Sequence, residues 1–102
     1  MNVQPNQTTT AEAMMRITHQ VMDKLFVDLM PPGFSIYKIA EYDPQVFPAP
    51  GLLFEKRDNP AARYIAILTS DTASVPALGE TVTDAISASI VKIEAMQGTV
   101  KQ

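Results

Sequence analysis

The residues that could take part in chemistry are few and lie far apart. His19 is the only histidine, and Asp23 follows it by four residues. On a helix this spacing places both side chains on one face, where a carboxylate and an imidazole can pair. A catalytic dyad would also need a nucleophile or a substrate pocket beside that face. We interpret the two residues as a solvated surface pair.

Other catalytic and ligand-binding patterns are missing from the sequence. There is no cysteine, which removes disulfides, thiolate metal sites and cysteine nucleophiles. The four glycines are too dispersed for a phosphate-binding loop, and no serine stands in a glycine-flanked elbow. The acidic residues are also dispersed, so they form neither a glycosidase carboxylate pair nor a calcium loop. We therefore expect a non-enzymatic protein with no metal and no cofactor.

Composition predicts a single folded domain of modest acidity. The chain has 102 residues, 46% of them hydrophobic and 19% charged, with a formal net charge of −3. The eight basic residues are scattered, so no patch predicts contact with nucleic-acid phosphates. The first residues lack the features of a signal peptide, and no apolar run approaches the roughly 18 residues of a membrane span. We expect no membrane contact and a cytoplasmic location.

A first helix is predicted from about residue 10 to residue 30, after a disordered tail at 1–8. Thr9 with Glu12, or Thr10 with Ala13, would cap its start. Proline and glycine at 31–33 would end it. Apolar side chains occupy one broad half of its circumference, which favours a helix lying across a sheet. They are Ala11, Met14, Met15, Ile17, Val21, Met22, Leu25, Phe26 and Leu29.

Three segments are predicted as strands: 34–42, 52–57 and 62–70. The first is rich in aromatic and β-branched residues, but its alternation is interrupted at Lys38. A turn at 58–61 would join the second and third in an antiparallel hairpin. The middle of 62–70 is apolar on both faces, which predicts an interior strand.

Two connections are predicted between these elements. The segment 43–51 holds three prolines and should be extended; its apolar residues Val46 and Phe47 either pack on the core or are presented to a partner. The segment 70–79 is rich in small polar residues and is predicted as a loop.

A second helix is predicted from Val82 to Met96. Thr81 should be its N-cap, with Asp84 at the third helical position. One apolar stripe would face the sheet. Small apolar residues form a second, nearly opposite stripe, which would let another helix approach closely and so predicts an interface. They are Ala88, Val91 and Ala95.

The predicted fold class is α+β, in the order α-β-β-β-α. A domain over residues 9–102 would be a two-layer sandwich with a three-stranded antiparallel sheet and both helices on one face. Ile65 and Ile67 would lie beneath the helices. The opposite face of the same strand would stay open for a second chain; it holds Tyr64, Ala66 and Leu68.

This predicted order resembles that of double-stranded-RNA-binding domains. Those domains carry basic residues at the start of their second helix, where this chain has Glu80-Thr81-Val82-Thr83-Asp84. The acidic sequence does not support the RNA-binding function that the order would imply.

We predict a protein-interaction or assembly protein that forms a homo-oligomer or binds a larger protein, as a structural connector or as an inhibitor. One alternative is a small-molecule-binding or enzymatic domain whose site forms between protomers, with His19, Tyr37 and Tyr64 as candidates. A second alternative is nucleic-acid binding. The interface candidates are Ala88, Val91, Ala95, Tyr64, Ala66, Leu68, Val46 and Phe47. The size and the missing catalytic motifs are also common among small proteins of viruses and mobile elements.

Overall fold

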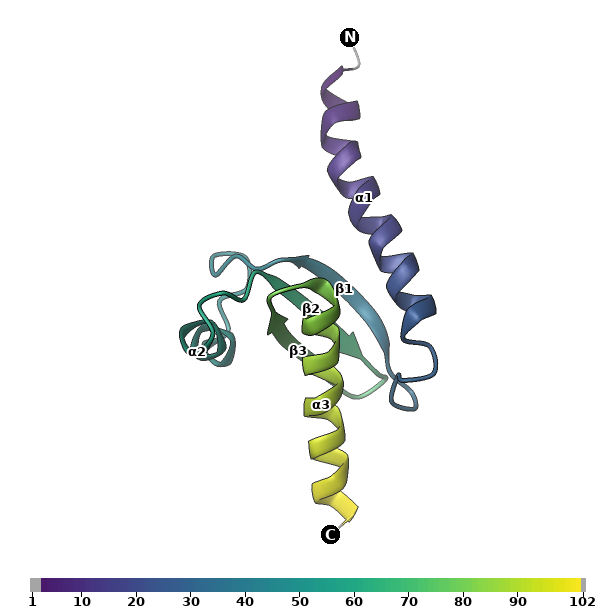
Figure 1. Cartoon of the computed structure of the whole chain (residues 1–102), viewed down its shortest axis with the longest axis vertical. Helices are drawn as coiled ribbons and strands as arrows, with labels where there is room; N and C mark the ends of the chain where they lie inside the picture. Colours follow the sequence, from purple (N-terminus) through teal and green to yellow (C-terminus); the bar gives the residue numbers. More distant parts are fainter. Residues whose placement is uncertain (1–2, 102) are drawn as a thin grey trace.

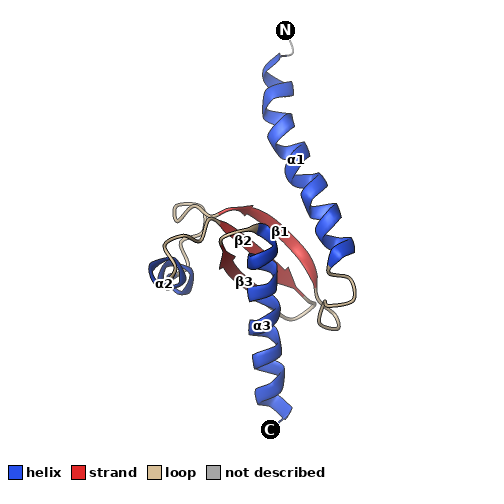
Figure 2. Cartoon of the chain, in the orientation of Figure 1, coloured by secondary structure: helices blue, strands red, loops and turns tan. Residues whose placement is uncertain are grey.

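The computed structural model describes residues 3–101, with side chains over residues 13–97. The described chain forms three helices and three strands (Figures 1 and 2). They are α1 (Val3–Leu25), β1 (Ser35–Glu41), α2 (Pro50–Asp58), β2 (Tyr64–Thr69), β3 (Ser74–Gly79) and α3 (Val82–Lys101). The α+β class and the three-stranded antiparallel sheet are confirmed. The order is α-β-α-β-β-α, so the resemblance in element order to RNA-binding domains does not hold.

The sheet has the strand order β1-β2-β3, with both pairs antiparallel. The strand at 62–70 was predicted to be interior, and β2 is indeed central. Its hairpin partner is β3 instead of residues 52–57. The hairpin closes with the amide of Ser70 donating to the carbonyl of Ala73 at 2.9 Å.

The two faces of β2 pack in two separate clusters. Ala66 and Leu68 are fully buried beneath α3, and Tyr64 packs at the margin of the same cluster. Ile65 packs on the opposite face with Leu52 and other residues. The predicted assignment of faces was therefore wrong. Both faces of β2 are apolar, so its pattern alone does not tell which one the larger helix covers.

A β-bulge explains the broken alternation of the first strand. The pairing of β1 with β2 shifts between Ile36 and Lys38. The extra residue lets Ile36 and Ile39 enter the same cluster, although three positions separate them. Beyond the bulge, Ala40 packs in the second cluster.

The segment predicted as the second strand is helix α2. Pro50 stands in its first turn, where a missing amide costs nothing, and the residues that follow include strong helix formers. Leu52 is buried on the second face of the sheet. The ammonium of Lys56 donates to the carbonyls of Pro60 and Ala62 at 2.7 and 2.6 Å, which fixes the chain between α2 and β2.

The segment predicted as a loop at 70–79 contains β3. Pro76 is compatible with this strand because β3 lies at the edge of the sheet, where a missing amide does not break the ladder. Gly79 ends the strand against the first turn of α3. A Cβ at Gly79 would lie 2.3 Å from the main-chain nitrogen of Ala85, so only glycine fits there.

Helix α3 packs along β2 and β3. Thr81 caps it as predicted, because its hydroxyl accepts the amide of Asp84 at 3.1 Å. Ala85, Ile86 and Ile93 are fully buried. The buried hydroxyl of Ser89 donates to the carbonyl of Val75 at 2.7 Å. The helix continues to Lys101, past the end predicted near residue 96.

Helix α1 contacts β1 through its C-terminal half, and its N-terminal part extends beyond the sheet along the long axis of the molecule (Figure 1). The molecule measures 60 × 30 × 22 Å, and its two termini lie at opposite ends. The helix begins at Val3, inside the segment predicted as a tail, and ends at Leu25, before the predicted end. The Thr9–Glu12 capping pair lies outside the residues whose side chains are described.

Candidate functional site

Among the described side chains, the largest set of exposed apolar residues on one element follows a single line along α1. Met14, Ile17, Val21 and Leu25 are 65%, 58%, 45% and 62% exposed. Their spacing of three, four and four residues places them on one face of the helix. We call these four residues the α1 stripe. No other element of the described chain covers the stripe, so it is free to contact another molecule.

A different line of α1 anchors the helix. Met15 and Met22 are half-buried against the main core cluster, together with buried Phe26 just past the helix end. The hydroxyl of Thr83 on α3 lies 3.9 Å from the sulfur of Met22. The anchoring residues are distinct from the α1 stripe, so the packing of α1 does not depend on the stripe.

His19 has a structural contact. A carbonyl can only accept, so Nε2 of His19 carries a proton and donates to the carbonyl of Ile36 at 2.9 Å. Asp23 lies 3.7 Å from the same nitrogen. The imidazole thus satisfies a main-chain group at the outer edge of β1. The geometry assigns His19 to holding α1 on the sheet.

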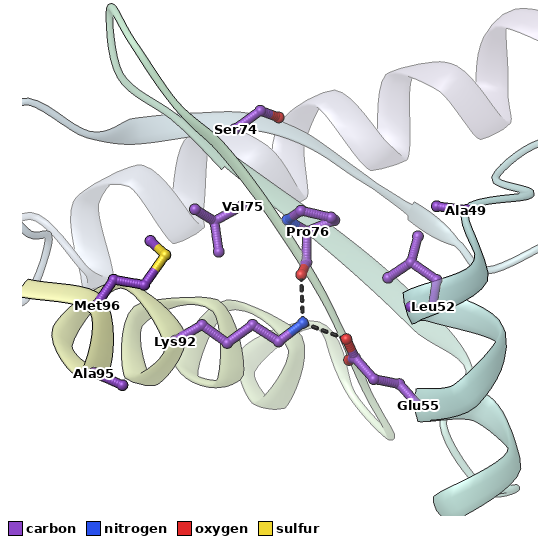
Figure 3. A pocket seen from close by; sticks show the side chains of 10 residues that line it. Ala49, Leu52, Glu55, Ser74, Val75, Pro76, Lys92, Ala95 and Met96 are labelled. Atoms are coloured by element: carbon purple, nitrogen blue, oxygen red, sulfur yellow. Dashed lines mark hydrogen bonds and ion pairs between the residues drawn. The ribbon is translucent and has the colours of Figure 1, made fainter. Parts of the chain in front are cut away.

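A second feature is a pocket of about 460 Å³ at the outer edge of β3, between α2 and α3 (Figure 3). This volume lies within the range of small-molecule and side-chain sites. The lining is mainly apolar and small. The lining residues are Ala49, Gly51, Leu52, Glu55, Ser74, Val75, Pro76, Lys92, Ala95 and Met96.

An ion pair between Glu55 on α2 and Lys92 on α3 borders this pocket. The ammonium of Lys92 also donates to the carbonyl of Pro76 at 2.7 Å, and the carboxylate of Glu55 accepts the amide of Leu78 at 3.2 Å. Both charged groups therefore bind main-chain atoms of the β3 edge as well as each other. The arrangement joins α2, β3 and α3 and leaves the pocket without net charge.

Near the second cluster, Tyr42 stacks on Phe47 with ring centroids 6.4 Å apart. Partial burial raises the pKa of Tyr42 above 10.0, and the carboxylates of Asp43 and Glu55 raise this pKa further. The phenol is held in its neutral form.

The predicted interface residues differ in their exposure to solvent. Ala66 and Leu68 are buried in the chain's own core and are not accessible to a partner, and Tyr64 is half-buried beside them. Val91 is 63% exposed on the outer face of α3, between half-buried Ala88 and exposed Ala95.

Of the two apolar residues in the proline-rich connection, Phe47 packs on the second cluster and Val46 is exposed. Phe47 thus packs on the core, as one alternative predicted, whereas contact of Val46 with a partner stays a prediction.

The residues of the α1 stripe were predicted to pack on the core. The signal that could have identified it was the width of the apolar arc, because one helix packed on a small sheet cannot bury nine apolar side chains over half its circumference. The grouping of methionines on this helix was a second signal. Met15 and Met22 fill the core margin, whereas Met14 is exposed.

Among the described residues, no group of three or more potential ligand side chains could hold a metal ion, and no helix is long and apolar enough to cross a membrane. No protein-family model matches the chain, and the comparisons found neither a similar curated protein nor a similar solved structure.

Proposed function

We propose that this chain is a non-enzymatic protein-interaction or assembly protein whose principal contact surface is the α1 stripe. The observation that carries the proposal is the exposure of four regularly spaced apolar side chains on a helix that projects beyond the sheet. Contiguous exposed apolar surface of this kind is typical of protein contact sites.

The energetics favour a contact that covers the stripe. Burying an aliphatic or methionine side chain contributes about 1.5–3 kcal/mol, and these side chains are about half exposed. Covering all four would thus contribute several kcal/mol toward association, before the cost of immobilising the partners. The α1 stripe contains no charged residue, so a partner that covers it does not desolvate a carboxylate or an ammonium group of the stripe.

The stripe fits a helix better than it fits a flat surface. Side chains at three- and four-residue spacing form a ridge that packs into the groove of a second helix. The partner in this proposal supplies an apolar helix, either from another copy of this chain or from a larger protein. The first case corresponds to a structural connector or ring component, and the second to an adaptor or inhibitor.

The test uses wild-type protein and a double variant, Ile17→Asp with Val21→Asp. Light scattering over a concentration series reports self-association, and a pull-down with tagged protein reports heterologous partners. We expect the double variant to lose association while its melting temperature stays close to that of wild type, because both side chains are exposed. A wild-type monomer at high concentration, together with the same pull-down profile for both proteins, would contradict the proposal.

A further inference from the structure

The outer edge of β3 is blocked at two of its three outward-facing residues and open at the third. In an antiparallel ladder the main-chain groups of successive residues point alternately toward the two sides. Because Ser70 pairs with Ala73, the residues of β3 that bond to β2 are 75, 77 and 79. Ser74, Pro76 and Leu78 therefore point their main-chain groups away from the sheet.

Pro76 and Leu78 cannot accept an additional strand. Proline has no amide hydrogen, and the carbonyl of Pro76 already accepts from Lys92. The amide of Leu78 already donates to Glu55. Proline and charged side chains are common means of protecting an edge strand from pairing with other chains.

Ser74 has no such protection. It is exposed, and no contact of the described residues occupies its outward amide and carbonyl. Ser74 also lines the pocket, as Figure 3 shows. Its main-chain donor and acceptor therefore lie beside an apolar cavity. An extended peptide presents the same pair of groups in complementary order, with side chains alternating to either side.

The character of the pocket limits the side chain it would take. Leu52, Val75 and Met96 give it an apolar lining, and Glu55 and Lys92 neutralise each other at its border. A charged group entering the pocket would lose water without gaining an unpaired opposite charge. A leucine, methionine or phenylalanine side chain would lose only unfavourable apolar hydration.

We propose that this edge binds a short extended segment of a partner protein, which pairs its main chain with Ser74 and places one apolar side chain in the pocket. The site lies at the opposite edge of the sheet from α1, which contacts β1. It is thus separate from the α1 stripe, and either surface can fail its test while the other passes. A chain with both surfaces could join a helical partner to a strand-forming one.

The probe is the capped peptide Ac-Thr-Val-Leu-Val-Thr-NH₂, compared with the same peptide carrying glycine at the centre. Both are titrated into ¹⁵N-labelled protein to millimolar concentration. We expect the leucine peptide to shift the amide resonances of Ser74, Val75 and Met96 and to slow hydrogen exchange at the Ser74 amide. The glycine peptide should bind about tenfold more weakly, because it leaves the pocket empty.

Two variants separate the main-chain contact from the side chain of Ser74. Ser74→Pro removes the outward amide and should abolish binding, since an edge position that starts a strand tolerates proline. Ser74→Ala keeps the amide and should bind as wild type does. A third variant, Gly51→Met, tests the pocket independently of the edge: a Cβ at Gly51 meets open space, so the longer side chain can enter the cavity and should weaken binding.

Absence of resonance shifts at millimolar peptide would overturn the proposal. Equal binding by Ser74→Pro and wild type would also overturn it, because the pocket would then hold apolar molecules without strand pairing. If Ser74→Pro does not fold, unchanged binding by Gly51→Met overturns the placement of the side chain in the pocket.

Discussion

Helices α1 and α3 are both long and amphipathic, yet they use their apolar residues differently. Helix α3 lies along β2 and β3 and buries Ile86 and Ile93 completely. Helix α1 contacts the sheet through its C-terminal half and leaves the α1 stripe uncovered. The difference shows that α3 completes the core of the domain, whereas α1 carries apolar surface beyond what the domain needs.

Helix α1 is anchored to the core, which gives its exposed apolar side chains a defined orientation. A helix end with no fixed attachment would not place its side chains in a defined direction. Met22 and the His19–Ile36 hydrogen bond hold the C-terminal part of α1 on the core, so the stripe has a fixed orientation. Surface held in this way is suited to a specific contact.

The largest predicted effect comes from a charge placed on the buried face of α3. Ile93→Glu would put an unpaired carboxylate in the core, and we expect a loss of about 4 kcal/mol or more in unfolding free energy. Val91→Glu, two residues away on the exposed face, should change stability by less than about 0.5 kcal/mol. Urea denaturation measures both, and similar losses would mean that α3 does not pack in the described orientation.

A second effect concerns the close approach of β3 to α3. Gly79→Ala would place a Cβ 2.3 Å from the main chain of Ala85, and we expect a loss of about 1–3 kcal/mol from the resulting shift. The matched variant Gly51→Ala meets no atoms and lies in α2, so it should stabilise the domain by up to about 1 kcal/mol. A neutral result for Gly79→Ala would show that α3 is free to move away from the strand.

A third pair of variants compares two methionines on α1. Met22→Ala removes a half-buried side chain, and we expect about 1–2 kcal/mol of lost stability, less than at a fully buried site. Met14→Ala removes an exposed side chain and should leave stability unchanged while weakening association. Thermal unfolding and light scattering check the two outcomes. Equal stability loss for both variants would mean that the stripe belongs to the core.

The smallest expected effect on stability is that of Tyr42 at alkaline pH. This residue lies in neither α1 nor α3. The folded state raises the pKa of Tyr42, so it binds the phenol proton more tightly than the unfolded chain does. Its contribution to stability is complete below pH 10 and is lost as the pH rises through the higher folded pKa. Tyr42→Phe should therefore flatten the decline in stability above pH 10. An identical decline in the variant would show that Tyr42 is not the group responsible.

The sequence predicted the parts of the fold that depend on local chemistry. β-Branched and aromatic residues predicted the strands at 35–41 and 64–69. The cap at Thr81 was predicted because its hydroxyl stands three residues before Asp84, whose amide needs an acceptor in the first turn of the helix. The interruption near Lys38 was visible as broken alternation, although only the pairing register identified it as a bulge.

The errors came from positions where tertiary context decides. Pro76 excludes a central strand but fits an edge, and sequence does not tell which strand is the edge. Leu52 and its neighbours were predicted as a strand, but they have no strict period, so their pattern does not distinguish a strand from a helix. The α1 stripe was missed because the sequence pattern of an apolar helix face is the same whether that face packs on its own core or on a partner. The free main-chain groups of Ser74 could not be predicted, because the residue types of the segment do not indicate which main-chain groups lack a hydrogen-bond partner.

The most direct test of the central claim compares Val21→Asp with Gln20→Asp, which place the same charge at adjacent exposed positions on different faces of α1. Sedimentation equilibrium over a concentration series, run with and without a partner recovered by pull-down, measures association. We expect Val21→Asp to abolish association and Gln20→Asp to retain it, with both proteins melting at the wild-type temperature. Association that survives Val21→Asp unchanged would contradict the role of the α1 stripe.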